Sequence, residues 1–327
     1  MRALQAHEYG EPTDVLTVGE MEVPLPGQLE VLVRVRATTL NFPDLLMVRG
    51  GYQVKAQMPF TPGVELCGEI VSLGSEVSGW QVGDRVLGGS VLPYGGFAEM
   101  AMMDAGDIYL APAVLDDGEA AALQYAYQTG WYALHRRAQI KSGETLLVHA
   151  AAGGVGSAAV QLGKAAGAFV IGVVGGSEKV AVAHAMGADI VVDRRTEDFV
   201  QVVKDVTDGR CADVVFDPVG GDAYRGSTKC IAFEGRIVLI GFAGGEIQSA
   251  ALNHALIKNY SILGLQWGVY RTKDPQGVQA CHNELARLAD AGLIRPLISE
   301  RIALNEVADG LKRLGAGRTI GRVSYQP

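Results

Sequence analysis

The sequence predicts an α/β protein with a β-rich domain built from both ends of the chain and a doubly wound parallel sheet between them. Three observations support this fold class: short alternating strands fill the first third, strands and helices alternate through the middle, and strand patterns return near the carboxyl end. At 327 residues, the chain also exceeds the length of one ordinary domain. We expect residues 1–122 and 266–327 to form the first domain and residues 123–265 the second.

Strand signals dominate the first third of the chain. In residues 30–37, three valines alternate with Leu32, Arg34 and Arg36, which is typical of a half-buried strand. Further short strands next to glycine-containing turns are expected at 69–73, 85–87 and 97–102. This spacing favours a small barrel or sandwich.

Strands and helices alternate through the middle of the chain. Strands are expected at 145–150, 169–174, 190–192, 213–216 and 236–240. Helices between them include 155–166 and a helix over 177–186 with Ser177 as its N-cap. Because this order puts a helix after most strands, we expect a parallel sheet with helices on both faces.

The pattern changes again after residue 260. One more strand is expected at 261–265 and a helix at 277–291. The segments that follow look like a return to the first domain: 297–302, 305–314 and 318–325.

Composition and charge exclude several classes of protein. The chain has 48% hydrophobic and 20% charged residues with a net charge of -8, which argues against nucleic acid or an anionic membrane as the main partner. No run approaches ~18 apolar residues, and the first ten residues lack the apolar core of a signal peptide. The four cysteines are scattered without a C-x-x-C, so we expect neither a disulfide framework nor a four-cysteine zinc site. Scattered thiols suit a reducing cytoplasm, where we expect the protein to reside.

A glycine-rich turn is the strongest motif. The run His-Ala-Ala-Ala-Gly-Gly-Val-Gly at residues 149–156 closes a predicted strand and opens a predicted helix, which is the context that a dinucleotide fingerprint needs. Small residues let the backbone approach a pyrophosphate, and the free N–H groups of the helix N-terminus attract its charge. The candidate contacts are Ala151, Gly153, Gly154, Val155 and Gly156. The alternative is a plain strand-to-helix turn with tight packing.

The end of the second strand favours NADPH over NADH. Enzymes that use NAD place an acidic residue about 20 positions after the turn to hold the ribose 2′-hydroxyl, whereas this strand ends in Gly175 with no carboxylate. Ser177, Lys179 and Arg194 follow and could hold the 2′-phosphate of NADPH. Glu178 is the nearest carboxylate, and in the first helical turn it can point away from them. The alternative is that Ser177 only caps a helix and that the two cations are solvated.

The sequence resembles the medium-chain dehydrogenase/reductase superfamily and, within it, the quinone oxidoreductase (zeta-crystallin-like) family. Besides the glycine turn, four segments carry the resemblance: residues 41–44, 59–65, 79–86 and 95–99. It covers almost the whole chain and implies a GroES-like catalytic domain, an inserted Rossmann domain and an active-site cleft between them. It also implies an oligomer, and we expect a homodimer with residues 262–265 as a candidate seam.

The same resemblance predicts that zinc is absent. Zinc-dependent alcohol dehydrogenases place a cysteine at the position of Asn41 and a histidine at the position of Val64, which cannot coordinate a metal. The four-cysteine structural lobe expected near residues 90–105 is missing, and Cys67 is expected to be a small core residue. Without a metal, oxidation of an alcohol lacks a group to stabilise the alkoxide.

Hydride delivery to a quinone or an α,β-unsaturated carbonyl remains feasible. The negative charge moves to an oxygen that hydrogen-bond donors can stabilise, and water or a side chain can supply the proton. The resemblance implies that Asn41 and Asp44 lie at the cleft with Tyr52 close by. Asn41 would offer an amide donor and Tyr52 a phenol donor, whereas Asp44 would orient neighbours or be an ordinary turn carboxylate. Leu46 stands where some relatives have a tyrosine. Tyr52 could compensate for that departure, and the alternative is that it is an ordinary half-buried tyrosine.

Four further positions are expected to contact the nicotinamide or its ribose. The resemblance places Thr129 on the nicotinamide side, and Val219, Gly241 and Phe242 follow strands on the cofactor-binding edge. Simple helix and turn chemistry is the alternative for each. The position of Arg194 is often a tyrosine in the family, and arginine there would strengthen the attraction of a phosphate.

We therefore expect an NADPH-dependent, metal-free reductase of quinones or α,β-unsaturated carbonyls. One alternative is a reductase of enoyl-CoA thioesters, with a basic entrance for which Arg49, Lys55 and Arg271 are candidates. Another is a crystallin-like protein that binds NADPH without turnover. The sequence does not separate one-electron from two-electron reduction of a quinone.

Overall fold

A computed structural model describes all 327 residues of the chain, which divide into two units. Unit 1 comprises Met1–Gln124 and Pro296–Pro327, and unit 2 comprises Tyr125–Arg295. The first boundary lies close to the expected one, whereas the second lies at 295/296 rather than 265/266. Each unit is described separately below.

Unit 1 contains a six-stranded sheet in the order β13-β14-β3-β4-β5-β6, in which β3 also pairs with β6. That extra pairing partly closes the sheet on itself, as expected for a small barrel. Its strands are β3 (Glu30–Thr39), β4 (Glu65–Leu73), β5 (Arg85–Ser90), β6 (Met100–Leu110), β13 (Ile298–Ile302) and β14 (Arg322–Tyr325). β1 (Arg2–Ala6) and β2 (Leu16–Glu20) form a separate antiparallel pair. Ser324 of β14 pairs with Thr39 of β3, so the end of the chain lies beside its first third.

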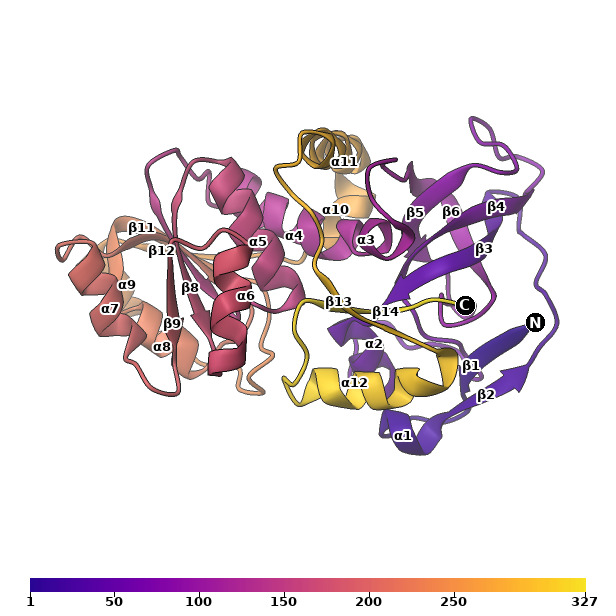
Figure 1. Cartoon of the computed structure of the whole chain (residues 1–327), viewed down its shortest axis with the longest axis horizontal. Helices are drawn as coiled ribbons and strands as arrows, with labels where there is room; N and C mark the ends of the chain where they lie inside the picture. Colours follow the sequence, from indigo (N-terminus) through magenta and orange to yellow (C-terminus); the bar gives the residue numbers. More distant parts are fainter. The chain divides into compact units, whose positions relative to one another are not determined.

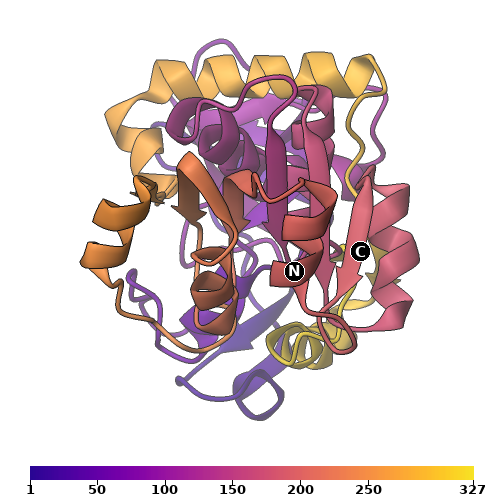
Figure 2. The ribbon, with the colours of Figure 1, turned by 90° about the vertical axis from the view of Figure 1, so that its left-hand side faces the viewer.

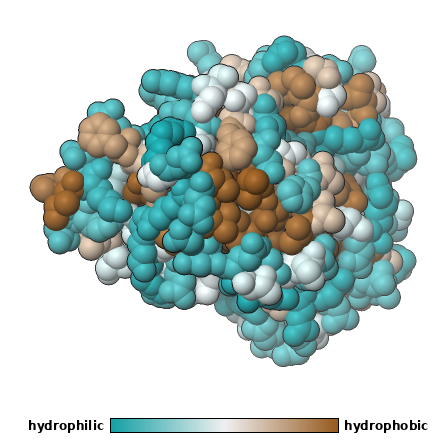
Figure 3. All heavy atoms as spheres, turned by 60° about the vertical axis from the view of Figure 1, so that its left-hand side comes forward, coloured by the Kyte–Doolittle hydropathy of each residue, from teal (hydrophilic) through white to brown (hydrophobic).

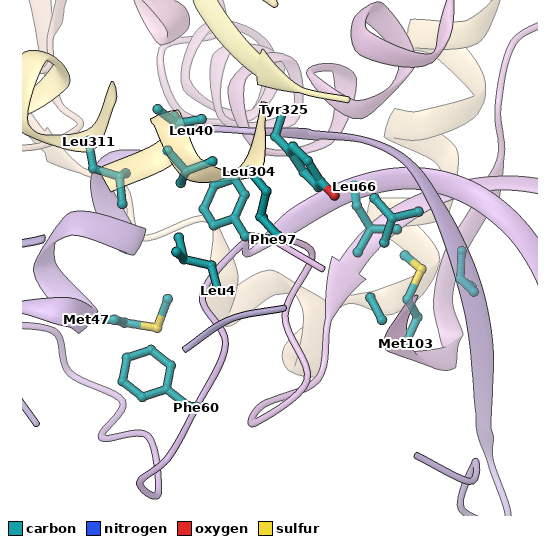
Figure 4. Packing of buried hydrophobic residues seen from close by; sticks show 14 of the residues in the cluster. Leu4, Leu40, Met47, Phe60, Leu66, Phe97, Met103, Leu304, Leu311 and Tyr325 are labelled. Carbon is teal, nitrogen blue, oxygen red and sulfur yellow. The ribbon is translucent and has the colours of Figure 1, made fainter. Parts of the chain in front are cut away.

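The core of unit 1 combines side chains from both ends of the chain. Figure 4 shows Leu4, Leu40 and Phe97 packed near Leu304 and Tyr325, and all five side chains are buried. The helices of this unit are α1 (Pro12–Val15), α2 (Phe42–Val48), α3 (Asp117–Ala121) and α12 (Val307–Gly315). This shared core explains why the terminal segments fold together although the whole of Tyr125–Arg295, about the size of a domain, separates them in the sequence.

Unit 2 contains the predicted parallel sheet, with strand order β12-β11-β10-β7-β8-β9. Its strands are β7 (Thr145–His149), β8 (Phe169–Val174), β9 (Ile190–Asp193), β10 (Ala212–Asp217), β11 (Ile231–Leu239) and β12 (Ser261–Gly264). The chain builds outward from β7 first to β8 and β9, and then in the other direction to β10, β11 and β12. The strand order therefore reverses between β7 and β10, where doubly wound sheets bind ligands at the carboxyl ends of the strands.

Helices cover both faces of this sheet, as Figures 1 and 2 show. The helices are α5 (Gly154–Ala165), α6 (Val180–Ala185), α7 (Phe199–Val206), α8 (Asp222–Ser227), α9 (Leu252–Lys258), α10 (Gly268–Lys273) and α11 (Pro275–Asp290). α4 (Thr129–Trp131) is a short α-helical turn between two π-helical segments, Leu123–Gln128 and Tyr132–Arg137. None of the helices combines the length and apolar character needed to cross a bilayer.

The helices α10 and α11 belong to unit 2, not to the first domain as the sequence suggested. The ring of Trp267 lies 5.0 Å from that of Tyr125, and Tyr270 lies 4.4 Å from Tyr132. These aromatic contacts join the α10 region to the segment that opens unit 2. Aromatic packing of this kind is not visible in strand and helix periodicity, which is why the sequence placed the boundary too early.

The expected helix over 177–186 is also divided in two. Ser177–Lys179 forms a 3₁₀ turn and the α-helix begins at Val180. The residue before the 3₁₀ turn is Gly176, with a φ of 126° that favours glycine, so Ser177 is not the N-cap.

Candidate functional site

The glycine-rich turn joins the carboxyl end of β7 to the first turn of α5. A Cβ atom at Gly156 would lie 2.0 Å from the carbonyl oxygen of Ala150, so only glycine allows the helix to start this close to the strand. At Gly153 the same oxygen would be 3.2 Å away, which is tight but less severe. Ala151 is fully buried and packs against β8, where a Cβ at Gly172 would lie 2.8 Å from its methyl group.

The first turn of α5 presents backbone N–H groups at the point where the strand order reverses. The amides of Gly154, Val155 and Gly156 occupy the first three positions of this 12-residue helix, where no carbonyl precedes them within the helix. These N–H groups and the helix dipole favour an anion. The structure thus brings together the five residues of the predicted pyrophosphate site in the expected strand–turn–helix order.

Cations gather at the carboxyl end of β8. The guanidinium of Arg194 lies over Gly175, where a Cβ would be 3.2 Å from its Nε and Nη2 atoms. Burial lowers the pKa of Lys179, Glu178 raises it, and the nearby positive charges of Arg195 and Arg194 lower it further. Because the charges of Arg194 and Arg195 act on the pKa of Lys179, the three cations share one region.

Two carboxylates lie close to these cations. Asp193 is buried and accepts hydrogen bonds from the N–H groups of Gly176, at 2.9 Å, and Arg195, at 3.1 Å, and these bonds lower its pKa. Glu178 does not point away from this region, because a Cβ at Gly176 would lie 2.4 Å from both of its carboxylate oxygens. The absence of a side chain at Gly176 leaves room for this exposed carboxylate to fold back toward the cations.

The loops after β10 and β11 are hydrogen-bonded to each other. The N–H of Gly244 donates to the carbonyl of Val219 at 2.9 Å, and the N–H of Ala243 donates to Pro218 at 3.0 Å. The ring of Phe242 lies against Gly220, where a Cβ would be 2.8 Å from it. The predicted residues Val219, Gly241 and Phe242 therefore lie together at the carboxyl edge of the sheet.

Polar side chains on the surface add further contacts to the loop after β11. Arg225 donates to both oxygens of Glu246, at 2.6 and 2.9 Å, and also to Asp222. These two partners raise the pKa of Arg225. The side-chain oxygen of Gln248 accepts from the N–H of Gly221 at 2.9 Å. Because the ion pairs are exposed, they add little to the stability of the unit, but the pair with Glu246 connects α8 to the loop after β11.

Thr129 opens α4, which packs on α5. A Cβ at Gly130 would lie 2.8 Å from the side chain of Leu162, so the two helices approach closely. Thr129 thus lies in unit 2 near the helix that opens with the glycine-rich turn, although its contact with a nicotinamide stays a prediction.

Asn41 and Asp44 belong to a buried polar cluster in unit 1, at the start of α2. One oxygen of Asp44 accepts from the N–H groups of Gly63, at 2.8 Å, and Val64, at 3.0 Å, while the other accepts from the N–H of Asn41 at 2.9 Å. Burial raises the pKa of Asp44 to about 7, although these three hydrogen bonds oppose the rise. Asp44 therefore ties α2 to the 63–64 segment and caps the start of α2, and a role at a substrate cleft stays a prediction.

The amide of Asn41 is engaged within the protein. It is 3% exposed, and its nitrogen donates to Glu65 at 3.0 Å and to the carbonyl of Thr39 at 3.1 Å. Its oxygen accepts from the guanidinium of Arg322. Both amide hydrogens thus have acceptors in the protein, and donation to a substrate stays a prediction.

Tyr52 lies in the loop after α2, half-buried against the core of unit 1. Glu65 and Arg322 are the site residues that the sequence reasoning missed. Glu65 belongs to the segment 59–65 that carries the family resemblance, but no role was assigned to it, and Arg322 begins the otherwise uncharged strand Arg322–Tyr325. The available signal was an arginine directly before an uncharged strand run, since arginine is rarely buried without a partner.

Comparison with known proteins agrees with this architecture. The model of the alcohol dehydrogenase GroES-like domain matches residues 27–113, and the model described as zinc-binding dehydrogenase matches residues 154–282. A quinone oxidoreductase-like protein 2 homolog of Nematostella vectensis is 35% identical over 98% of this chain and 88% of its own length. The chain is a member of the medium-chain dehydrogenase/reductase superfamily, in its quinone oxidoreductase family.

Two further members of the quinone oxidoreductase family cover the whole chain. The quinone oxidoreductase of Pseudomonas aeruginosa is 35% identical over 100% of this chain and 99% of its own length. The crystal structure of Escherichia coli quinone oxidoreductase complexed with NADPH superposes with a TM-score of 0.91, at 30% identity, over 100% of both chains. These matches confirm the resemblance and the fold class predicted from the sequence.

The residues of this quinone oxidoreductase-family chain do not fit the zinc ion that one matching model names. Val64 has no donor atom, and the amide nitrogen of Asn41 faces Glu65 with its hydrogens. The Cys67 thiol is fully buried, and burial raises its pKa to about 12. No group of three or more histidine, cysteine, aspartate or glutamate side chains is arranged to hold a metal ion.

Proposed function

We propose that this chain is an NADPH-dependent reductase that transfers hydride to a quinone or an α,β-unsaturated carbonyl without a metal ion. The observation that carries the proposal is the guanidinium of Arg194 over Gly175, where an NAD enzyme would place a carboxylate. The complex of the Escherichia coli relative with NADPH supports the choice of cofactor.

In this proposal, unit 2 binds the cofactor at three places. The first-turn amides of α5 hold the pyrophosphate, and Ser177, Lys179 and Arg194 hold the 2′-phosphate. The ribose and nicotinamide are held by Thr129 and by the two hydrogen-bonded loops after β10 and β11, which carry Val219, Gly241 and Phe242. Bound NADPH supplies the hydride.

The acceptor is proposed to lie beside Asn41 and Tyr52. Hydride addition to a quinone or an enone leaves negative charge on oxygen, which the Tyr52 hydroxyl and the Asn41 amide would stabilise. For Asn41 this requires the oxygen of the bound quinone or enone to share an amide hydrogen that is now directed at Thr39 or Glu65. Water or Tyr52 supplies the proton, so that NADPH, a proton and a quinone give NADP⁺ and a hydroquinone.

Calorimetric titration with NADPH and NADH tests the cofactor assignment. We expect NADPH to bind at least about tenfold more tightly, equivalent to about 1.4 kcal/mol. Equal dissociation constants would contradict the proposed role of Arg194 and Lys179. NADPH binding without oxidation by any acceptor would instead support the crystallin-like alternative.

A panel of acceptors separates the quinone or enone reductase from the thioester reductase. The three candidate cations for a thioester entrance already have neighbours: Arg49 pairs with Glu11 at 2.8 Å, Lys55 lies over the ring of Tyr9, and Arg271 lies over Trp267. We therefore expect kcat/KM to be higher with a quinone or an alkenal than with a crotonyl thioester. A preference for the thioester by orders of magnitude would replace our first choice.

We also propose that the chain forms a homodimer through the edge of unit 2. β12 is an edge strand, and α9 before it exposes Leu252, Leu256 and Ile257 at 74, 77 and 71%. Figure 3 shows that apolar side chains reach the surface in groups. A second copy could extend the sheet and cover these side chains. Light scattering should give twice the chain mass for the wild type and a lower mass for Leu256→Glu, and a wild-type monomer would contradict the proposal.

A further inference from the structure

The guanidinium of Arg322 lies buried in unit 1, with Asn41 and Glu65 as its side-chain partners. Arg322 is 8% exposed and begins the last strand, β14. Its Nη1 donates to the carbonyl of Leu40 at 3.2 Å and to the amide oxygen of Asn41. Its Nη2 lies 3.3 Å from Oε1 of Glu65, which is fully buried.

These two charges fix the orientation of the Asn41 amide. The cation of Arg322 contacts the amide oxygen, and the carboxylate of Glu65 contacts the amide nitrogen at 3.0 Å. Rotation of the amide by half a turn would set its NH₂ group against the guanidinium and its oxygen against the carboxylate. Both contacts would be repulsive, and they would be poorly screened in a buried place. The assignment of the amide oxygen and nitrogen therefore follows from the charges.

Stability alone does not explain a buried guanidinium at this place. The Nε atom of Arg322 is buried without a hydrogen-bond partner within the protein, and Nη2 contacts Glu65 at 3.3 Å as an ion pair without forming a hydrogen bond. Unsatisfied buried donors cost stability, and a buried ion pair is often no more stabilising than apolar side chains of similar volume. What Arg322 does supply is a fixed positive charge in contact with the amide oxygen of Asn41.

We propose that Arg322 is a positioning residue of the acceptor site, holding the Asn41 amide by its oxygen and balancing the charge of Glu65. The inference rests on the proposed reductase function, with Asn41 beside the acceptor. Arg322 acts through Asn41 and does not itself contact the reacting atoms. Asp44, the other titratable group at Asn41, binds its backbone N–H and leaves the amide side chain to Arg322, Glu65 and Thr39.

Three variants separate positioning from stabilisation. Arg322→Met removes the cation and leaves Glu65 buried without it, so we expect both stability and kcat to fall. The double variant Arg322→Met with Glu65→Gln removes both charges but keeps a carbonyl oxygen that the Asn41 nitrogen can reach. Arg322→Lys keeps a cation that can approach the Asn41 oxygen.

The measurement is the thermal midpoint together with kcat, KM for a quinone and the NADPH dissociation constant of each full-length variant. We expect the double variant to recover most of the lost midpoint while kcat stays roughly 10- to 100-fold below wild type. Arg322→Lys should recover much of kcat, and NADPH binding should stay close to that of the wild type in all three.

Two results would overturn the inference. One is a double variant that regains the wild-type kcat along with its thermal midpoint, because Arg322 would then act on stability only. The other is a folded Arg322→Met variant with unchanged kcat. An absence of turnover in the wild-type chain would instead overturn the proposed function, and the inference with it.

Discussion

Single residues show how burial changes the chemistry of polar groups in this chain. Asp44 is fully buried, and three backbone N–H groups hold it at the start of α2. Burial raises its pKa to about 7, far above its usual range. The sequence left Asp44 as either an orienting carboxylate or an ordinary turn carboxylate, and its hydrogen-bond partners could not be predicted because two of them lie in the distant segment 63–64.

The raised pKa of Asp44 predicts a specific dependence of stability on pH. Between its usual pKa, about 4, and about 7, the folded state keeps a proton that the unfolded state has lost. The contribution of Asp44 to the free energy of unfolding should therefore fall as pH rises through this window.

Urea denaturation of the wild type and Asp44→Asn at about pH 5 and pH 8 measures this dependence. We expect the stability advantage of the wild type to be larger at pH 5. An advantage that grows toward pH 8 would mean that the three N–H donors outweigh burial and keep Asp44 ionised.

Arg194 is the residue on which cofactor choice depends most. Arg194→Ser should weaken NADPH binding about tenfold, roughly 1.4 kcal/mol, and leave NADH binding within about twofold, because only NADPH carries the 2′-phosphate. Arg287→Ser, on the exposed face of α11, is the matched control and should change neither. A parallel loss of affinity for both cofactors in Arg194→Ser would assign it a structural role.

Among the elements, the strand–turn–helix unit at β7 and α5 was predicted almost residue by residue. Its signal is local, since small residues at fixed spacing join an apolar strand to a helix. The segment after β8 was predicted less well, because helix periodicity reports neither the positive φ of Gly176 nor the position of the Glu178 carboxylate beside it. The π-helical segments around α4 have no sequence signal of the kind that periodicity detects.

Alanine substitutions at two glycines test the geometry of the turn. Gly156→Ala would set a methyl group 2.0 Å from the Ala150 oxygen, so the helix must shift and NADPH affinity should fall more than about tenfold. In Gly153→Ala the added methyl group would lie 3.2 Å from the same oxygen, so NADPH affinity and the thermal midpoint should change less than in Gly156→Ala. Equal effects of the two substitutions, by calorimetry and thermal melting, would contradict the tight approach at Gly156.

At the scale of the whole molecule, the class of each unit could be predicted from periodicity, but the boundary near the carboxyl end could not. Strand alternation and the β–α order are local and visible in sequence. The assignment of residues 266–295 to unit 2 depends on long-range contacts, such as those of Gln161, whose amide binds both the N–H and the carbonyl of Arg295 at 2.6 and 3.0 Å. The partnership of Arg322 with Asn41 spans 281 positions and was invisible for the same reason.

Single-turnover reduction of a quinone by NADPH, on protein stripped of metal with a chelator, tests the central claim most directly. We predict that the reduced nicotinamide absorbance decays at the same rate before and after chelation, and that NADPH deuterated at the transferred position slows the decay. Loss of the reaction on chelation, with its return on adding zinc, would contradict a metal-free site. Intact NADPH in the presence of every quinone and enone tested would contradict the reductase itself.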